Sequence, residues 1–302
     1  ITISNGHSGT DINATDIIGV DSKGIKAFAS PDTVDVSTLI APGWSHESSV
    51  IAAFDELTKY RGDIQVIIDT PANLSPEDAV KWTNGKHSGL LSQLDNQWFS
   101  VYYPWVKLVG YEKPVPPSTI VAAQWAYSDA DSDCWFAPAG YGNNTENGRG
   151  YLADVEDTAV ELTKENRDAL YGYNNIINPI AKFVGKGVVL FGNKTTKRVR
   201  FNENESMMCS LNVRRLCNFI RKMVVQASYA ELFNPNDKFT WNSWKLRLEP
   251  RFRQIQVNRG IEAFKVKMDE STVTPEDIRV GRMPGVIYIK PTRSAEFIPI
   301  SF

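Results

Sequence analysis

Apolar positions in the first third of the chain alternate between strand-like runs and helix-like spacing. Short apolar runs at Val36–Ile40, Ile64–Ile68 and Trp98–Tyr103 predict buried strands. From Val50 to Tyr60 the apolar residues recur at helical spacing, and Ser45 is predicted to be the N-cap of that helix. A strand–helix–strand order predicts a parallel sheet with helices packed on it.

Two proline-containing stretches mark a helix start and a chain boundary. Ser75–Asp78 predicts a helix start, with Ser as the cap, Pro at the first helical position and two acids at the positive end of the helix dipole. Lys113–Pro117 holds three prolines and predicts a linker, because proline continues neither a helix nor a central strand. We therefore expect residues 1–33 to be a flexible lead-in, 34–115 an α/β domain and 116–302 an α+β domain.

The second part of the chain mixes long amphipathic helices with strands. Thr163 is predicted to cap one helix and Thr274 another. A helix from Leu211 to Val224 has one apolar face, with the polar side chains expected opposite it on Arg214, Arg215, Asn218, Arg221 and Lys222. A further helix spans Trp241–Ile255, with a kink expected at Pro250. Strands are predicted at Ala263–Met268, Val286–Ile289 and Glu296–Phe302.

Composition is that of a globular protein, but charge is unevenly divided. The 302 residues are 42% hydrophobic and 23% charged, with a net charge of −2. Residues 1–150 hold 9 basic against 18 acidic side chains, whereas residues 151–302 hold 24 against 17. No apolar run approaches the roughly 20 residues of a membrane helix, so no membrane contact is expected. Three cysteines without metal spacing favour free, buried thiols.

Candidate catalytic and ligand-binding patterns are weak. Ser45, Asp69 and His87 could be assembled as a hydrolase triad, but no G-x-S-x-G elbow accompanies them. Gly187–Thr195 imitates a phosphate-binding loop, yet Asn193 displaces the required Lys and the intervening residues favour a strand. The alternating acids Asp129–Asp133 lack the Gly and Glu of a calcium loop. We therefore expect no catalytic residue, cofactor or metal.

The basic stretch 195–259 leaves two interpretations open. It holds 13 Lys and Arg against 5 Asp and Glu, with aromatic residues among them. Nucleic-acid binding is one interpretation. Docking of an acidic protein is the other, because the aromatics fall on the apolar face of a helix and leave the cations on a separate face.

From about Val115 to Phe302 the sequence resembles the tail sheath proteins of contractile-tailed bacteriophages, with pyocin-type and type VI secretion sheaths as more distant relatives. The resemblance rests on the order and spacing of motifs, which are Val115–Ser118, Ala137–Gly140, Arg149-Gly150, Glu165–Leu170, Ile177–Pro179, Gly187–Gly192, Asn212–Leu216, Pro235-Asn236, Gly260, Asp269, Pro291 and Ile298–Phe302. Upstream, Asp69–Pro71 and Tyr102–Trp105 extend it to roughly Val34.

The resemblance implies a structural subunit and no enzyme. Such subunits stack as six-membered rings around a tail tube, attach to a baseplate, and contract to drive the tube through the host envelope. The location implied is the virion tail, with the host cytoplasm during assembly. An α/β-hydrolase-like enzyme and a nucleic-acid-binding protein using residues 195–259 are the alternatives.

The resemblance also implies roles for two sets of residues. Terminal arms of the family add strands to neighbouring subunits, and here the terminal strand comprises Glu296, Phe297, Ile298, Ile300 and Phe302. The family also contacts the tube through its inner domain, which suggests tube-facing cations at Lys238, Lys245, Arg247, Arg251 and Arg253.

Two departures from the family shape the remaining expectations. The family's N-terminal arm has no counterpart here, so we expect that further sequence precedes Ile1 and that the 302 residues alone are monomeric. Residues 141–148 form a longer polar segment than the family pattern and are expected to be a disordered or species-specific loop. For the protein as a whole, the resemblance implies no direct nucleic-acid contact.

Overall fold

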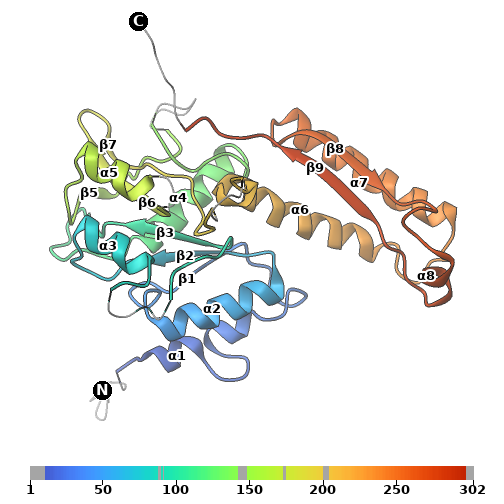
Figure 1. Cartoon of the computed structure of the whole chain (residues 1–302), viewed down its shortest axis with the longest axis horizontal. Coiled ribbons are helices and arrows are strands. Elements are labelled where there is room, and N and C mark those ends of the chain that lie inside the picture. Colours follow the sequence, from blue (N-terminus) through green and yellow to red (C-terminus); the bar gives the residue numbers. More distant parts are fainter. Residues whose placement is uncertain are drawn as a thin grey trace, which may run out of the picture.

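The computed structural model describes residues 11–87, 90, 92–141, 148–172, 175–199 and 204–296. Figure 1 shows two parts, a broad lobe built on a β-sheet and an elongated arm that projects from it. We call the described residues between 11 and 210 the α/β lobe, and residues 211–291 the arm. After the arm the chain returns towards the lobe (Figure 1).

A five-stranded sheet with the order β1-β2-β3-β6-β7 forms the centre of the lobe. The first four strands in that order are parallel and β7 is antiparallel to β6. Their bounds are Thr38–Ile40 (β1), Gln65–Asp69 (β2), Phe99–Tyr103 (β3), Ile177–Phe183 (β6) and Gly187–Leu190 (β7). The parallel strands predicted from the first third of the sequence are therefore confirmed. The sheet also runs across residue 115, where the sequence predicts a boundary, because β6 pairs with β3.

Helices cover both faces of this sheet. The lobe also contains α1 (Ala14–Ile18), a 3₁₀ turn (Gly24–Phe28), α2 (Ser48–Arg61), α3 (Pro76–Thr83), α4 (Ser118–Asp131), α5 (Lys164–Tyr171), a second 3₁₀ turn (Met207–Cys209) and the antiparallel pair β4 (Val106–Leu108) and β5 (Val155–Thr158). Successive residues of β2 point to opposite cores: Val66 and Ile68 pack with α2 and α3, and Ile67 packs with α4. Burial on both faces explains why the strand sequences are continuous apolar runs.

Most predicted helix starts are confirmed, but the role assigned to Ser45 is wrong. Ser75, Thr163 and Thr274 each accept a backbone N–H as N-caps of α3, α5 and α8 (Pro275–Arg279). Helix α2 begins at Ser48 after Glu47, which makes no side-chain cap bond. Ser45 is completely buried and hydrogen-bonds to Asp69 instead, so a tertiary contact replaces the local one.

The arm has its own hydrophobic core. It contains α6 (Leu211–Tyr229), α7 (Lys238–Val257), β8 (Ile261–Lys267), α8 (Pro275–Arg279) and β9 (Val286–Pro291). Buried side chains from both long helices meet those of the β8–β9 ribbon, among them Trp244, Leu248 and Phe252. The predicted helices and the two described strands are confirmed, and Pro250 lies inside α7. The chain is thus a mixed α/β fold.

The first turns of α6 are embedded in the lobe, contrary to the expected outward polar face. The side chains of Arg214 and Arg215 are buried. Arg214 donates to Gln97 (3.1 Å) and lies over the Trp98 ring. Arg215 pairs with Asp129 on α4 and lies over the Trp125 ring. These partners are distant in sequence, so helical periodicity could not reveal them.

Candidate functional site

The cations predicted to face a tube are all on α7, but they do not form one patch. Lys238 pairs with Glu270 (2.6 Å) and Arg247 pairs with the buried Glu231 (3.2 Å). Lys245 lines a shallow surface depression together with Lys238 and the acids that follow β8. Arg251 and Arg253 are exposed, and no ion pair forms to either within the described part of the chain.

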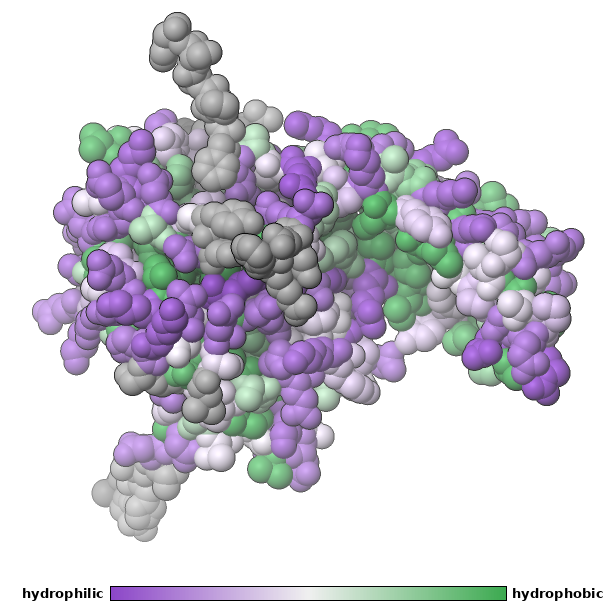
Figure 2. All heavy atoms as spheres, viewed as in Figure 1, coloured by the Kyte–Doolittle hydropathy of each residue, from purple (hydrophilic) through white to green (hydrophobic). Residues whose placement is uncertain are grey.

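The solvent side of α7 carries a line of apolar side chains that was not predicted from the sequence. Phe239, Leu246 and Val257 are 82%, 68% and 77% exposed. Their spacings of seven and eleven residues place them on the same side of a helix. Separately from these three residues, hydrophobic side chains gather on the visible face of the arm near its junction with the lobe, whereas most of the visible lobe surface is hydrophilic (Figure 2). Exposed apolar clusters of this kind mark interaction surfaces.

The β8–β9 ribbon is the most open β-structure in the described residues. The two strands pair antiparallel with each other and with no other strand of the part described. Phe264 and Ile289 pack against the arm core, while Tyr288 is 58% exposed on the other face. A two-stranded ribbon has two edges with unpaired N–H and C=O groups, which can accept further strands.

Only the first residue of the predicted terminal strand is described, and it lies on the lobe. Phe297, Ile298, Ile300 and Phe302 are outside the described residues. The Glu296 carboxylate accepts a hydrogen bond from the Tyr171 hydroxyl (2.8 Å) and one from the Asn193 amide (3.4 Å). It borders a cavity of about 340 Å³ that Arg167 and Phe191 also line. The chain is therefore attached to the lobe just before its last six residues.

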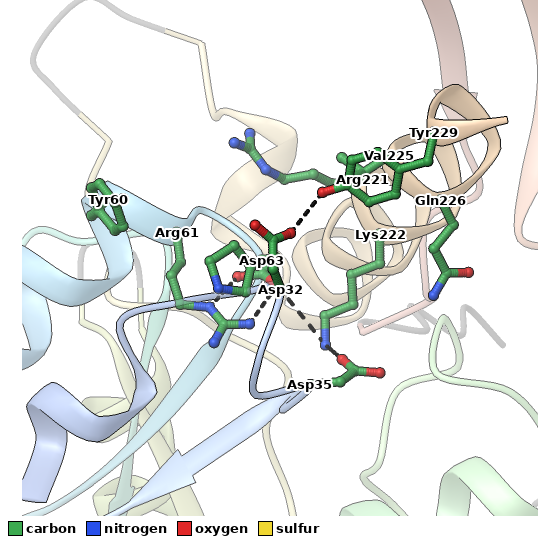
Figure 3. A pocket seen from close by; sticks show the side chains of 11 residues that line it. Asp32, Asp35, Tyr60, Arg61, Asp63, Arg221, Lys222, Val225, Gln226 and Tyr229 are labelled. Atoms are coloured by element: carbon green, nitrogen blue, oxygen red, sulfur yellow. Dashed lines mark hydrogen bonds and ion pairs between the residues drawn. The ribbon is translucent and has the colours of Figure 1, made fainter. Parts of the chain in front are cut away.

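A polar cluster joins α6 to the segment that precedes β1 (Figure 3). The Lys222 ammonium donates to Asp35 (2.7 Å), to the carbonyl of Val36 (2.6 Å) and to the hydroxyl of Ser37 (3.1 Å). The Tyr229 hydroxyl donates to Asp32 (2.6 Å). We call these contacts from α6 to residues 32–37 the clasp.

The clasp rests on a second, buried ion pair. Arg61, at the end of α2, pairs with Asp63 through two nitrogens, each 2.9 Å from a carboxylate oxygen. The same guanidinium donates to the carbonyls of Phe28 and Val34, so it holds the segment that Lys222 reaches. Sequence periodicity gave no signal for the contacts to Phe28 and Val34, because these residues are 33 and 27 positions from Arg61.

The candidate triad does not assemble. Ser45 and Asp69 are bonded to each other, but the other side-chain partner of Asp69 is Ser118, whose backbone N–H and hydroxyl both donate at 2.8 Å. Burial raises the pKa of Asp69. His87 is half-buried beyond the end of α3, whereas Ser45 and Asp69 are completely buried. The arrangement cross-links three chain segments, which are the end of β2, the loop before α2 and the start of α4.

The loop-like sequence Gly187–Thr195 is a strand followed by internally bonded side chains. Gly187–Leu190 is β7, as preferred from the sequence. The Lys194 ammonium donates to the carbonyls of Tyr171 and Gly172 at the end of α5, and burial lowers its pKa. The Thr195 hydroxyl donates to the carbonyl of Met208 (2.7 Å). These groups hold the fold together and leave no phosphate cradle.

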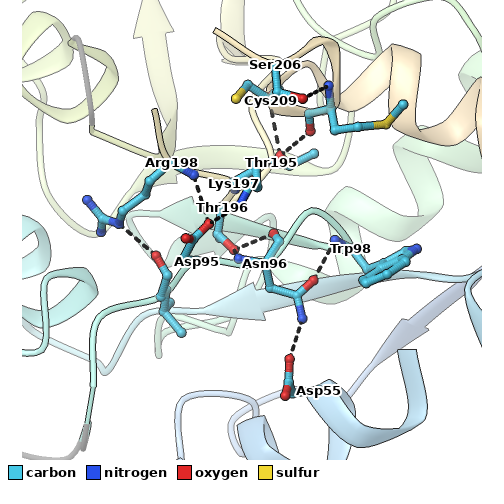
Figure 4. Close-up of polar contacts among 12 residues, drawn as sticks. Asp55, Asp95, Asn96, Trp98, Thr195, Thr196, Lys197, Arg198, Ser206 and Cys209 are labelled. Atoms are coloured by element: carbon cyan, nitrogen blue, oxygen red, sulfur yellow. Dashed lines mark hydrogen bonds and ion pairs between the residues drawn. The ribbon is translucent and has the colours of Figure 1, made fainter. Parts of the chain in front are cut away.

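Part of the basic stretch that suggested nucleic-acid binding is used in contacts with the lobe. Figure 4 shows the start of it lying across the loop that precedes β3. Thr196 exchanges hydrogen bonds with the backbone of Asn96, and Lys197 pairs with Asp95 (3.1 Å). The buried Arg198 guanidinium donates to the carbonyls of Leu94 and Thr83. Together with the burial of two arginines in α6, this breaks up the predicted basic face.

Metal-binding and membrane-spanning features are absent from the part of the chain that the structure describes. Among these residues, no group of three or more His, Cys, Asp or Glu side chains could hold a metal ion. No helix in the described ranges is long and apolar enough to cross a membrane. All three cysteines are free, and burial raises the pKa of the Cys134 thiol to about 12.

Comparisons with known proteins agree with this architecture. Residues 203–302 match the family described as phage tail sheath C-terminal domain. The tail sheath protein of Vibrio phage KVP40 is 30% identical over 97% of this chain and 45% of its own length. That of Enterobacteria phage T4 is 26% identical over the whole chain and 46% of its own length. The chain thus spans just under half the length of these relatives.

Solved structures show the same fold. The sheath of the extracellular contractile injection system PVC, in its contracted state, superposes with a TM-score of 0.76 at 22% identity, over 93% of this chain and 74% of that one. A chain of the contracted baseplate of the anti-feeding prophage gives 0.74 at 22% identity, over 93% and 76%. The resemblance to contractile tail sheaths is thereby confirmed. Residues 203–302 thus match the phage tail sheath C-terminal domain, and the chain is similar along nearly its whole length to tail sheath proteins.

Proposed function

We propose that this chain is the part of a contractile tail sheath subunit that builds hexameric rings, stacks them around a tail tube and carries the contraction that drives the tube into the host. The observation that carries the proposal is the β8–β9 ribbon, whose two edges are open to strands from other copies. Similarity to curated tail sheath proteins supports it. The same proposal places the protein in the virion tail after assembly in the host cytoplasm, with the baseplate at one end of the sheath.

Strand addition is the linkage we propose between subunits. The terminal stretch Glu296–Phe302 is apolar at Phe297, Ile298, Ile300 and Phe302 and carries one charged side chain. Pairing it with an open edge of β8–β9 in a neighbouring copy would join subunits through main-chain hydrogen bonds. Such a joint lets each subunit pivot as a rigid body while staying connected. Without the additional sequence of full-length relatives, we expect the 302 residues alone to remain monomeric.

The tube contact is proposed for α7. The candidate residues are Lys238, Lys245, Arg247, Arg251 and Arg253. They differ in whether an acidic side chain of the arm already pairs with them. Arg251 and Arg253 are exposed and have no ion pair among the described residues, whereas Lys238 and Arg247 already have acidic partners. Contacts between exposed charges weaken as salt rises, which suits a contact that must release during contraction.

Two variants of the full-length subunit separate these roles. Deletion of residues 297–302 is expected to abolish sheath-like tubes in negative-stain electron microscopy while leaving the circular dichroism spectrum unchanged. Charge reversal at Arg251→Glu and Arg253→Glu is expected to leave self-assembly intact and to weaken sedimentation with purified tail tubes, most strongly at low salt.

The matched control reverses two exposed cations on the lobe, Lys23→Glu and Lys26→Glu, and is expected to bind tubes as the wild type does. Tubes formed by the deletion variant would refute strand addition. Equal tube binding by the α7 variant and the lobe control would refute the electrostatic contact.

A further inference from the structure

The loop between α6 and α7 presents a fully exposed phenylalanine on a strained backbone. Phe233 is 103% exposed and has a φ of +68°. A hydrogen bond from the backbone N–H of Asn234 to the carbonyl of Glu231 (3.3 Å) closes a turn that has Phe233 at its third position. Turns that need a positive φ at this position usually have Gly or Asn there, because a bulkier residue is strained. Phe233 is therefore unfavourable twice, in its backbone and in its apolar ring in water.

Contacts on both sides of Phe233 hold it in this conformation. The carboxylate of Glu231 is buried and accepts hydrogen bonds from Ser243 (2.9 Å) and Arg247 (3.2 Å) on α7. After the turn, the Asn236 amide donates to a carbonyl in the segment before β9 (2.7 Å). Backbone strain persists only where the surrounding contacts impose it, and such positions are concentrated at functional sites. The loop is thus a rigid support for an exposed aromatic ring.

The lobe has a cavity whose lining suits an aromatic ring. Its volume is about 340 Å³, and its wall includes Ala137, Ala139 and Pro179. This volume is at the small end of the range for ligand sites, which is about 300–1,000 Å³. Phe191 also lines the cavity and is 41% exposed, and its ring centre is 5.0 Å from that of Phe183. Aromatic rings attract each other in offset or edge-to-face contacts, so this wall favours one further ring.

The ring and the cavity lie at opposite ends of α6, so they cannot meet within one molecule. Asn193 lines the cavity and donates to Asn212 (2.9 Å) in the first turn of α6. Phe233 follows the last residue of α6 by four positions. The 19 residues of this helix separate the two places by about 28 Å, much more than the reach of a side chain. A contact between them must therefore join two copies.

We propose that Phe233 of one copy inserts its ring into the Phe191-lined cavity on the lobe of a second copy. The inference rests on the proposed function, because that function brings the copies together, and it adds a side-chain contact that is separate from strand addition. The two surfaces differ, so the contact is head-to-tail, and head-to-tail contacts between identical chains close into rings or continue as helices. Burial of the ring in the assembly would offset the unfavourable state of Phe233 in the isolated chain.

Two substitutions remove this contact from opposite sides. Phe233→Gly removes the ring and suits the positive φ, and Ala139→Trp fills the cavity. Tyr111→Gly is the matched control, because Tyr111 is an aromatic residue of the lobe that is 67% exposed.

Tube formation by the full-length subunit is measured first, by negative-stain electron microscopy over a concentration series. Phe233→Gly and Ala139→Trp are each expected to raise the concentration needed for tubes about tenfold, which corresponds to about 1.4 kcal/mol, and the control is expected to have no effect. The double variant should assemble no worse than either single variant, because both changes remove the same contact. In the 302-residue chain, Phe233→Gly is expected to leave the urea midpoint of unfolding unchanged or to raise it, which separates a lost contact from a lost fold.

Cross-linking tests the contact without relying on tubes. Copies of the 302-residue chain with Phe233→Cys are mixed at high concentration with copies that carry Ala139→Cys, and a short bifunctional maleimide is added. A covalent mixed dimer is expected above the level that either variant gives alone. Replacing the first variant by Tyr111→Cys is expected to remove this dimer.

The outcomes distinguish this inference from the proposed function. If the wild-type subunit forms no tubes, the proposed function fails, while cross-linking still decides whether the ring meets the cavity. Normal tube formation by Phe233→Gly, or absence of the mixed dimer, overturns the inference. Weaker binding of Phe233→Gly to purified tail tubes together with normal self-assembly also overturns it, because the ring would then dock on the tube.

Discussion

At the scale of single residues, Asp69 shows how a buried carboxylate can serve structure alone. Asp69 is the last residue of β2 and is completely buried. Its carboxylate accepts hydrogen bonds from the Ser45 hydroxyl (3.0 Å) and from the backbone N–H and hydroxyl of Ser118 (2.8 Å each). The backbone of Gly43 also contributes a donor. The carboxylate therefore joins β2 to the loop before α2 and to the start of α4.

Asp69→Asn is expected to lower the free energy of unfolding by about 1–3 kcal/mol at pH 7. The reason is that the amide N–H group of Asn would face hydrogen-bond donors, and the backbone N–H of Ser118 cannot become an acceptor. Urea denaturation followed by tryptophan fluorescence measures the change. Asp154→Asn, an exposed carboxylate on the lobe, serves as the control and is expected to change stability by no more than about 0.5 kcal/mol.

The effect of Asp69 on stability should also depend on pH. Burial raises its folded-state pKa above 3.8, so the folded protein binds this proton more tightly than the unfolded chain. The resulting stabilisation is complete below pH 3.8 and is lost as the pH rises through the raised pKa. The difference between wild type and Asp69→Asn is therefore expected to be larger at the acidic end of this window than at pH 7. A difference that does not change with pH would contradict the assignment.

Residue-level prediction from sequence succeeded where the interaction is local. Ser75 and Thr274 are bonded within their own first turn, and both caps are confirmed. Ser45 and Arg215 have partners 24 and 86 residues away, so their roles could not be read from neighbouring positions. Tyr171, which donates to Glu296, is 125 residues distant from it and escaped prediction for the same reason.

At the scale of elements, helix α6 is fixed near its start by buried arginines and midway by the clasp. Lys222 makes three hydrogen bonds to residues 35–37 and lies 4.0 Å from Asp63. Its position beside the Arg61–Asp63 pair couples the arm helix to the end of α2. The direction in which the arm projects is therefore set by polar contacts as well as by the apolar core.

Lys222→Met is expected to destabilise the chain by about 1–3 kcal/mol, because it removes hydrogen bonds from a charged donor while keeping the aliphatic stem. It should also speed amide exchange in residues 32–37. Arg221→Met is the control, since Arg221 is exposed and no ion pair to it is present among the described residues. Equal effects of both substitutions would show that the clasp does not hold the segment.

The clasp has an acid-sensitive member. The hydrogen bond from Lys222 lowers the pKa of Asp35. The stabilisation that this ion pair gives the folded state is therefore present above pH 3.8 and is lost as the pH falls through the lowered pKa. Asp35 is largely exposed, so its protonation should change the free energy of unfolding only slightly. We therefore expect the effect to be measurable as faster amide hydrogen exchange in residues 32–37 when the pH is lowered.

Elements themselves were predicted well where a repeating pattern existed. The three parallel strands and both long helices follow from periodicity alone. Periodicity did not reveal that β6 and β7 belong to the same sheet, because the pairing of β6 with β3 joins segments separated by α4, β5 and α5. A proline-rich segment predicts a chain turn, but it does not reveal which elements share a core.

At the scale of the whole molecule, the lobe and the arm have separate hydrophobic cores. Leu170 is completely buried in the core that α2 and α3 share with the sheet. Leu248 is completely buried between the long helices and the ribbon of the arm. The cores meet near Trp135, whose indole N–H donates to the carbonyl of Asn258 (3.0 Å).

Separate cores predict two cooperative units. Leu248→Ala is expected to remove about 2–5 kcal/mol from the stability of the arm, and Leu170→Ala a similar amount from the lobe. In differential scanning calorimetry, the transition of the arm should move to a lower temperature in Leu248→Ala. The same transition should stay at its wild-type temperature in Leu170→Ala. A single transition that shifts equally in both variants would show that the two parts unfold together.

The length of α6 gives its fixed end a mechanical meaning. Its 19 residues span about 28 Å at 1.5 Å per residue, and its first turns are embedded in the lobe. Treated as a lever, a helix of that length converts a tilt of about 10° at its base into a displacement of about 5 Å at its end. That displacement is roughly the spacing between two β-strands. The clasp opposes such a tilt, because it ties Lys222 and Tyr229 in the second half of α6 to residues 32–37 of the lobe. In such an arm, accuracy of position at the far end depends on a few polar atoms along one helix.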